Sequence, residues 1–189
     1  MEHKKMLNIG IIGVVTVGTG VIKVLLRNKD NITHRIGAEL KIKKILDKDT
    51  ERAAAKIREL GLNADLLTAD VNDLILDPEI DIIVEVIGGI HPAQEFIIKA
   101  LENGKSVVTA NKDLIAAHGK ELFDAASHHQ VDLFFEASVA GGIPIIQSMK
   151  ESLAGNRIKH IMGIVNGTTN YILTKMTNEK KSFQEVLAQ

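Results

Sequence analysis

The 189-residue sequence contains no cysteine and no tryptophan, and aromatic residues make up only 3% of it. Without cysteine the chain can form neither a disulfide nor a thiolate metal site. This fits a reducing compartment, so we expect a cytoplasmic protein. The formal net charge of -1 provides no positive field for nucleic acid, and few aromatic side chains are available to stack on bases. We therefore expect no nucleic acid among the partners.

Long apolar runs are also missing from the sequence. No stretch approaches the ~18 uncharged residues typical of a membrane span, so we expect no membrane partner. The apolar residues after Met6 are interrupted by Asn8, Gly10 and Gly13, which predicts a first strand rather than a signal peptide. With 45% hydrophobic residues, the chain can bury one good core and the beginning of a second.

Strand-like and helix-like segments alternate along most of the chain. The expected strands cover 7–13, 40–46, 81–87, 106–109 and 131–135, and the expected helices cover 17–28, 50–60, 71–76, 92–103 and 112–127. Thr50 is expected to cap the second helix. The segment 81–87 is too apolar for an edge and is predicted to be a central strand. The alternation predicts an α/β fold with a Rossmann-like, doubly wound and mostly parallel sheet.

After residue 140 the pattern changes. We expect a helix over 143–153, a turn, a strand over 158–165 and helical segments to the end. This predicts the opening of a second, α+β domain, with the first domain covering residues 1–140 and the second covering residues 141–189.

A glycine-containing turn lies where the first strand meets the first helix, at Gly13-Val14-Val15-Thr16-Val17-Gly18. This is the position of a dinucleotide fingerprint, in which glycines let the backbone approach the pyrophosphate. Val15 stands where the middle glycine is expected, and its β-branched side chain would push or tilt the phosphates. An ordinary tight turn is the alternative, and the motif alone leaves the two interpretations about equally open.

The end of the second strand offers Asp47 or Asp49 as the acid that binds a ribose hydroxyl of NAD. Lysines 43, 44 and 48 in the same region would instead suit the extra phosphate of NADP. The coenzyme is therefore left open between NAD and NADP. A solvated surface turn is the simpler interpretation of this charged cluster.

Two further strand ends carry small and polar residues, namely Gly88-Gly89 and Thr109-Ala110-Asn111-Lys112. Because the carboxyl ends of parallel strands meet at one edge, both should line the same crevice, where Asn111 and Lys112 can donate to cofactor and substrate. Lys112 is also compatible with a surface position in a first helical turn. A cation is unfavourable at that end of a helix, however, so a ligand-binding role is favoured.

Two glycine-rich stretches follow, Glu136-Ala137-Ser138-Val139-Ala140-Gly141-Gly142-Ile143-Pro144 and Gly163-Ile164-Val165-Asn166-Gly167-Thr168-Thr169-Asn170-Tyr171-Ile172. Glycines in the first stretch would let successive carbonyls turn toward a hard cation, although a plain strand-to-helix turn fits the composition better. In the second stretch, Asn166 or Thr168 is expected to cap the following helix. The histidines show no i, i+4 pair of a helical zinc site.

These stretches, the turn at Gly13 and the residues after Thr109 closely resemble the amino-terminal part of the homoserine dehydrogenase family, from Asn8 to the end of the chain. The resemblance implies interconversion of L-homoserine and L-aspartate 4-semialdehyde with NADP or NAD, in threonine, methionine and isoleucine biosynthesis. It implies an NAD(P)-binding domain over residues 1–140 and the truncated start of a substrate and dimerisation domain over residues 141–189. The full-length enzyme is expected to be a homo-oligomer.

The resemblance also implies roles for individual residues. Lys112 is expected at the nicotinamide and substrate, and the backbone carbonyls of Glu136, Val139, Gly141 and Ile143 are expected to bind a monovalent cation, Na+ by preference. The expected cofactor-binding residues are Gly13, Val14, Val15, Thr16, Val17, Gly18, Gly88, Thr109, Asn111 and Lys112. The family usually has glycine at the position of Val15.

The family's proton-transfer lysine, its partner aspartate and its substrate-binding glutamate are expected beyond Gln189. The chain alone is therefore expected to be inactive. Two alternatives are carried forward: a cofactor-binding fragment without turnover, and a different oxidoreductase built on the same nucleotide-binding fold.

Overall fold

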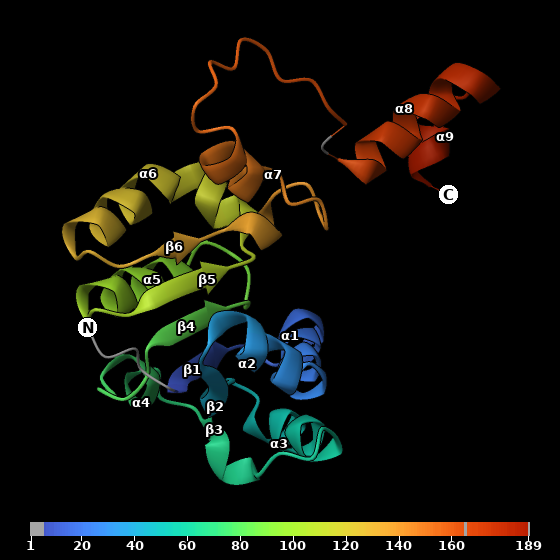
Figure 1. Cartoon of the computed structure of the whole chain (residues 1–189). Coiled ribbons are helices and arrows are strands. Elements are labelled where there is room, and N and C mark those ends of the chain that lie inside the picture. The colour runs from blue at the N-terminus through green and yellow to red at the C-terminus, as the bar shows by residue number, and fades with distance from the viewer. Residues whose placement is uncertain (1–5, 165, 189) are drawn as a thin grey trace. The chain divides into compact units, whose positions relative to one another are not determined.

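The computed structural model describes residues 6–164 and 166–188. The chain forms two compact units, one extending to Ser138 and the other beginning at Val139. Figure 1 labels the helices and strands of both units. This division lies near residue 140, where the pattern of the sequence changes.

The first unit is built on a parallel sheet of six strands, whose strands are labelled in Figure 1. In spatial order the strands are β3 (Leu67–Thr68), β2 (Glu39–Leu46), β1 (Met6–Ile12), β4 (Ile82–Glu85), β5 (Ser106–Thr109) and β6 (Leu133–Phe134). The order 3-2-1-4-5-6 belongs to doubly wound dinucleotide-binding folds, so the expected Rossmann-like sheet is confirmed. β4 pairs with β1 and with β5, as expected for a central strand.

Helices connect the strands and cover both faces of the sheet. They are α1 (Thr16–Arg27), α2 (Lys29–Ile36), α3 (Thr50–Glu59), α4 (Asn72–Ile75), α5 (Ala93–Glu102) and α6 (Lys112–His128), with short 3-10 turns at Ala64–Leu66 and Glu136–Ser138. Side chains alternate across each strand. Ile83 therefore joins a cluster with α4, α5 and α6, whereas Val84 joins another with α1 and α3. Two apolar layers thus hold the sheet between them.

Two local features differ from expectation. α2 was not anticipated because its sequence, Lys29–Ile36, is polar and buries no residue, so it lacks the apolar stripe that reveals a helix. The expected cap at Thr50 is wrong by one position. The Asp49 carboxylate accepts a hydrogen bond of 3.1 Å from the Arg52 amide, and Thr50 is the first helical residue.

The second unit is mainly helical, with α7 (Ile145–Gln147), a single π-type turn at Ser148–Ser152, α8 (Gly167–Glu179) and α9 (Phe183–Leu187). Asn166 caps α8 by accepting a hydrogen bond of 2.8 Å from the Thr169 amide, which selects it over Thr168. The expected strand over 158–165 is not present in its described part, residues 158–164. A strand needs a partner for its backbone groups, and no residue of the described chain pairs with this segment.

Candidate functional site

The turn between β1 and α1 needs glycine at its two ends. Gly13 has φ of +104°, and a Cβ atom there would lie 2.8 Å from Ile87 Cγ2. At Gly18, a Cβ atom would lie only 1.9 Å from the carbonyl oxygen of Gly13. α1 therefore starts in direct contact with the turn, and the two glycines make this close approach possible.

Val15 differs from these two glycines. Its φ of -88° is negative, so this position does not need the left-handed backbone that favours glycine. The side chain is 52% exposed and lines the cavities on both sides of the turn. The effect of Val15 must therefore fall on whatever approaches the turn, not on the fold of the turn itself.

Asp47 follows β2 and contacts the same turn. One carboxylate oxygen accepts a hydrogen bond of 2.9 Å from the Val14 amide, and the other accepts one of 3.0 Å from the Asp49 amide. The Arg52 guanidinium lies 3.7 Å from the Asp47 carboxylate. Because Asp47 is only 6% exposed, a solvated surface turn is the wrong interpretation for this residue.

Lys43 and Lys44 are engaged elsewhere. Lys43 forms an ion pair of 2.8 Å with Asp77, and the Lys44 ammonium lies 3.5 Å from the carbonyl oxygen of Asp65. One lysine and one arginine, Lys48 and Arg52, line the cavity beside Asp47. One acid and two cations therefore lie together at this end of the cavity.

A cavity of about 360 Å³ opens at the carboxyl edge of β1, β2 and β4. Its lining includes Gly13, Val15, Asp47, Lys48, Arg52, Ala69, Gly88, His91 and Phe96. The structure thus brings together predicted site residues from the ends of three strands. Thr109, Asn111 and Lys112 are not part of this lining.

Glu85, the last residue of β4, was missed by sequence reasoning. It is fully buried, and its carboxyl oxygens accept hydrogen bonds from the Thr109 hydroxyl at 2.6 Å and from the Ile87 amide at 2.9 Å. The sequence feature that could have revealed it is a single acidic residue at the end of an otherwise apolar strand. Thr109 is also fully buried, so its side chain serves Glu85 rather than an open cavity.

Asn111 and Lys112 lie at the start of α6 and differ sharply in exposure. Asn111 is 5% exposed and caps the helix, because its side-chain oxygen accepts a hydrogen bond of 3.1 Å from the Leu114 amide. The Lys112 side chain is 74% exposed, with its ammonium 3.6 Å from the Asp113 carboxylate. Lys112 therefore presents a charge to solvent at this edge of the sheet.

The four carbonyls expected to bind a cation fall on both sides of the division between the units. Glu136 belongs to the first unit, whereas Val139, Gly141 and Ile143 belong to the second. Within the second unit, Ala140 and Gly141 both have left-handed backbones, with φ of 55° and 62°. The cation site stays a prediction.

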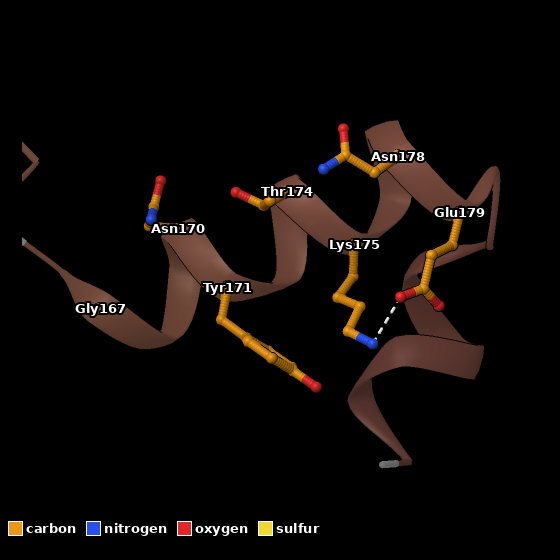
Figure 2. A pocket seen from close by; sticks show the side chains of 7 residues that line it. All are labelled: Gly167, Asn170, Tyr171, Thr174, Lys175, Asn178 and Glu179. Carbon is orange, nitrogen blue, oxygen red and sulfur yellow. Dashed lines mark ion pairs between the residues drawn. The ribbon is translucent and has the colours of Figure 1, made fainter.

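A separate hollow of about 300 Å³ lies along α8, and Figure 2 shows the side chains that line it. Its lining residues are Gly167, Asn170, Tyr171, Thr174, Lys175, Asn178 and Glu179. Lys175 lies 2.5 Å from Glu179, and their hydrogen bond raises the pKa of the lysine and lowers the pKa of the glutamate. This hollow contains none of the residues expected to bind cofactor, substrate or cation.

Among the helices of the described residues, none has the length and apolar character needed to cross a membrane.

Comparison with known proteins assigns both parts of the chain. Residues 13–136 match the family described as homoserine dehydrogenase, NAD binding domain, and residues 144–189 match homoserine dehydrogenase. The homoserine dehydrogenase of Bacillus subtilis is 47% identical over 98% of this chain and 42% of its own length. That of Pseudomonas aeruginosa is 44% identical over 98% of this chain and 41% of its own length.

Solved structures agree with these matches. A homoserine dehydrogenase from Thiobacillus denitrificans is similar with a TM-score of 0.89 and 44% identity, covering 100% of this chain and 42% of that one. A hyperthermophilic archaeal homoserine dehydrogenase in complex with NADPH has a TM-score of 0.78 and 30% identity, covering 97% of this chain and 60% of that one. The chain spans about two fifths of the length of its curated relatives.

Proposed function

This chain belongs to the homoserine dehydrogenase family, whose members are NAD(P)-dependent oxidoreductases, and we propose that its first unit binds NAD or NADP across the carboxyl edge of the sheet. The observation that carries the proposal is the turn from Gly13 to Gly18. It lies between β1 and α1, beside the point where the strand order reverses. In this fold, dinucleotides bind at that point with the pyrophosphate at the helix N-terminus.

The two halves of the coenzyme then fall on different strands. The cavity beside Asp47 and Ala69 suits the adenosine half, since the acid after β2 is the ribose partner in this fold. The nicotinamide half falls beside β4 and β5, near Gly88 and Lys112. Hydride transfer is the chemistry that the bound coenzyme supplies. The chain's own residues orient the two reactants.

Both coenzymes stay in the proposal. A ribose hydroxyl can donate to Asp47, whereas the additional phosphate of NADP would be attracted by Lys48 and Arg52 and repelled by Asp47. Parallel calorimetric titrations with NAD and NADP test this point. Saturable binding of either coenzyme supports the proposal, and binding of neither contradicts it.

For the whole protein we propose interconversion of L-homoserine and L-aspartate 4-semialdehyde, with a cytoplasmic location and a homo-oligomeric assembly. Oxidation removes a hydride from the alcohol carbon and a proton from its hydroxyl group. The exposed ammonium of Lys112 is suited to hold the substrate oxygen beside the nicotinamide. A role in coenzyme binding without turnover is the second candidate, because the turn from Gly13 to Gly18 supports binding and does not by itself supply a group for proton transfer.

One assay, run on this chain and on the full-length protein, separates the two candidates. Each is incubated with L-homoserine and NADP, and NADPH formation is followed by absorbance, with Lys112→Met as the comparison. NADPH formation by the full-length protein that Lys112→Met lowers supports the oxidoreductase. Coenzyme binding with no turnover in either protein supports the second candidate.

The monovalent cation is a separate proposal. Left-handed backbones at Ala140 and Gly141 support it, because such turns can direct neighbouring carbonyls toward a common point. Thermal unfolding in equal concentrations of NaCl and of an organic cation salt tests it. Stabilisation by Na+ alone is the expected result, and identical unfolding in both salts would contradict it.

A further inference from the structure

Glu85 is an acidic residue at a buried position, where an apolar residue would be expected. It is 0% exposed and pairs with Ile12 of β1 and Thr109 of β5. Burying a carboxyl group is unfavourable unless its oxygens are hydrogen-bonded. Its oxygens accept from the Ile87 amide at 2.9 Å, from the Gly88 amide at 3.4 Å and from the Thr109 hydroxyl at 2.6 Å. The group therefore joins the ends of two strands.

The connection continues through Thr109 to Asn111. The Thr109 hydroxyl oxygen accepts a hydrogen bond of 3.0 Å from the Asn111 amide, and the Asn111 side chain donates one of 2.5 Å to the carbonyl oxygen of Gly89. Glu85, Thr109, Asn111 and Gly89 thus form a closed ring with the turn that follows β4. We call this set the edge network.

The edge network holds in place two exposed features, the turn at Gly88 and Gly89 and the start of α6 at Lys112. Gly88 and Gly89 both have φ of +74°, and a Cβ atom on Gly88 would meet no atom within 4 Å. These glycines are therefore required by backbone conformation and not by packing. Lys112, which directly follows Asn111, has a side chain that is 74% exposed.

We propose that the edge network, with Glu85 at its centre, is a positioning device for the nicotinamide half of the dinucleotide. The inference rests on the proposed function. β4 and β5 form the half of the sheet that receives the second mononucleotide in this fold. By holding the glycine turn and the start of α6 in one arrangement before binding, the network reduces the ordering that binding would otherwise require.

Thr109→Val is the sharpest test, because valine keeps the shape of threonine and removes the hydroxyl group that joins Glu85 to Asn111. The Kd is measured by calorimetry for whichever of NADH and NADPH binds the natural chain more tightly, and for ADP. We expect the dinucleotide Kd to rise about tenfold, equivalent to about 1.4 kcal/mol, with little change for ADP. Thr109→Ser, which restores the hydroxyl, should recover most of the affinity.

Asn111→Asp provides a second variant that does not depend on Thr109→Val folding. Aspartate is as good a helix cap as asparagine, but it cannot donate to the carbonyl oxygen of Gly89. Lys105→Met is the matched control for loss of a buried polar group. Lys105 is 3% exposed and donates a hydrogen bond of 2.8 Å to the carbonyl oxygen of Ile80, at the amino end of β5.

The expected pattern is a raised ratio of dinucleotide Kd to ADP Kd in Thr109→Val and Asn111→Asp, and an unchanged ratio in Lys105→Met. If the natural chain bound dinucleotide but both edge-network variants kept its ratio of dinucleotide Kd to ADP Kd, this inference would be overturned and the proposed function would stand. A natural chain that bound no dinucleotide would overturn the proposed function and this inference together.

Discussion

At the residue scale, the side chain of Val15 is expected to lower the affinity for the coenzyme. Its φ of -88° does not call for glycine, and its side chain lines the cavities beside the turn. Val15→Gly should therefore improve the approach of the pyrophosphate without changing the turn, and we expect the coenzyme Kd to fall about tenfold, equivalent to about 1.4 kcal/mol. Calorimetry measures this, with Val24→Gly as the control because Val24 is exposed on α1, the helix that follows the turn, and lines neither cavity. Unchanged or weaker binding in Val15→Gly would show that the phosphates avoid this side chain.

Gly18 and Gly20 form a natural pair for testing the contact between α1 and the turn. A Cβ atom on Gly18 would lie 1.9 Å from the backbone of Gly13, whereas one on Gly20 would meet no atom within 4 Å. We expect Gly18→Ala to lower the free energy of unfolding by about 3 kcal/mol or more. Gly20→Ala should raise it by about 0.5 to 1 kcal/mol, because alanine favours a helix interior. Urea unfolding measures both free energies. Equal changes in the two variants would contradict the close contact between Gly18 and Gly13.

Single residues also show where sequence reasoning stops. Gly13 and Gly18 could be recognised from the sequence because their spacing is typical of a turn between a strand and a helix. The role of Glu85 was not, because it depends on Thr109, which lies 24 positions away and is brought close only by pairing of β4 with β5. Asp47 was recognised as a candidate acid, but its burial against the turn required the fold.

At the scale of elements, α8 offers a clear test of local capping. Its first turn is capped by Asn166, and no residue of α8 is buried, so packing does little to hold this end. Asn166→Ala should destabilise the start of the helix by about 1 kcal/mol. Faster amide hydrogen exchange at 168–171 is the expected observation. Thr168→Ala, which leaves the capping oxygen in place, should change it much less. Equal exchange in the two variants would contradict the assignment of the cap.

Elements with strong periodicity were predictable, and weakly patterned ones were not. β5 was expected over 106–109 and is found there, because a short apolar run is bounded on both sides by polar residues. α2 was not predicted because its sequence is polar and none of its residues is buried, so it has no apolar stripe. The expected strand over 158–165 failed in its described part for the opposite reason. Its apolar residues favour a strand, but strand formation depends on a partner outside the segment.

At the scale of the whole molecule, an ion-paired cluster ties β2 to the connection before β4 and predicts how stability responds to acid. Burial by itself would raise the pKa of Asp77. Hydrogen bonds from Lys43 and from the Glu79 amide, and the charges of Lys43 and Lys105, outweigh burial and lower this pKa below its usual value. A lowered carboxyl pKa contributes stability above the unfolded pKa of about 4, and this contribution is lost as pH falls through the folded pKa.

Asp77→Asn should accordingly lower the free energy of unfolding at pH 7 by about 1 to 2 kcal/mol, between the values for exposed and buried pairs. The difference from the natural chain should shrink below about pH 4, because there the unfolded state binds a proton at Asp77 that the folded state, with its lowered pKa, does not yet bind. Urea unfolding at pH 7 and pH 3.5 measures this. Asp124→Asn, which removes an exposed pair with Lys120, should have a smaller effect at pH 7. A difference that stayed constant between the two pH values would contradict the account.

The central claim is that a nicotinamide dinucleotide binds at the carboxyl edge of the sheet, and amide chemical-shift mapping tests it most directly. Isotope-labelled chain is titrated with NADPH and, separately, with NADH, and the shift of each backbone amide is followed to saturation. The account predicts that the largest changes fall at residues 13–19, 47–48, 87–89 and 110–113, which come from the ends of β1, β2, β4 and β5. Saturable changes confined to α8 and its hollow, or no changes with either coenzyme, would contradict it.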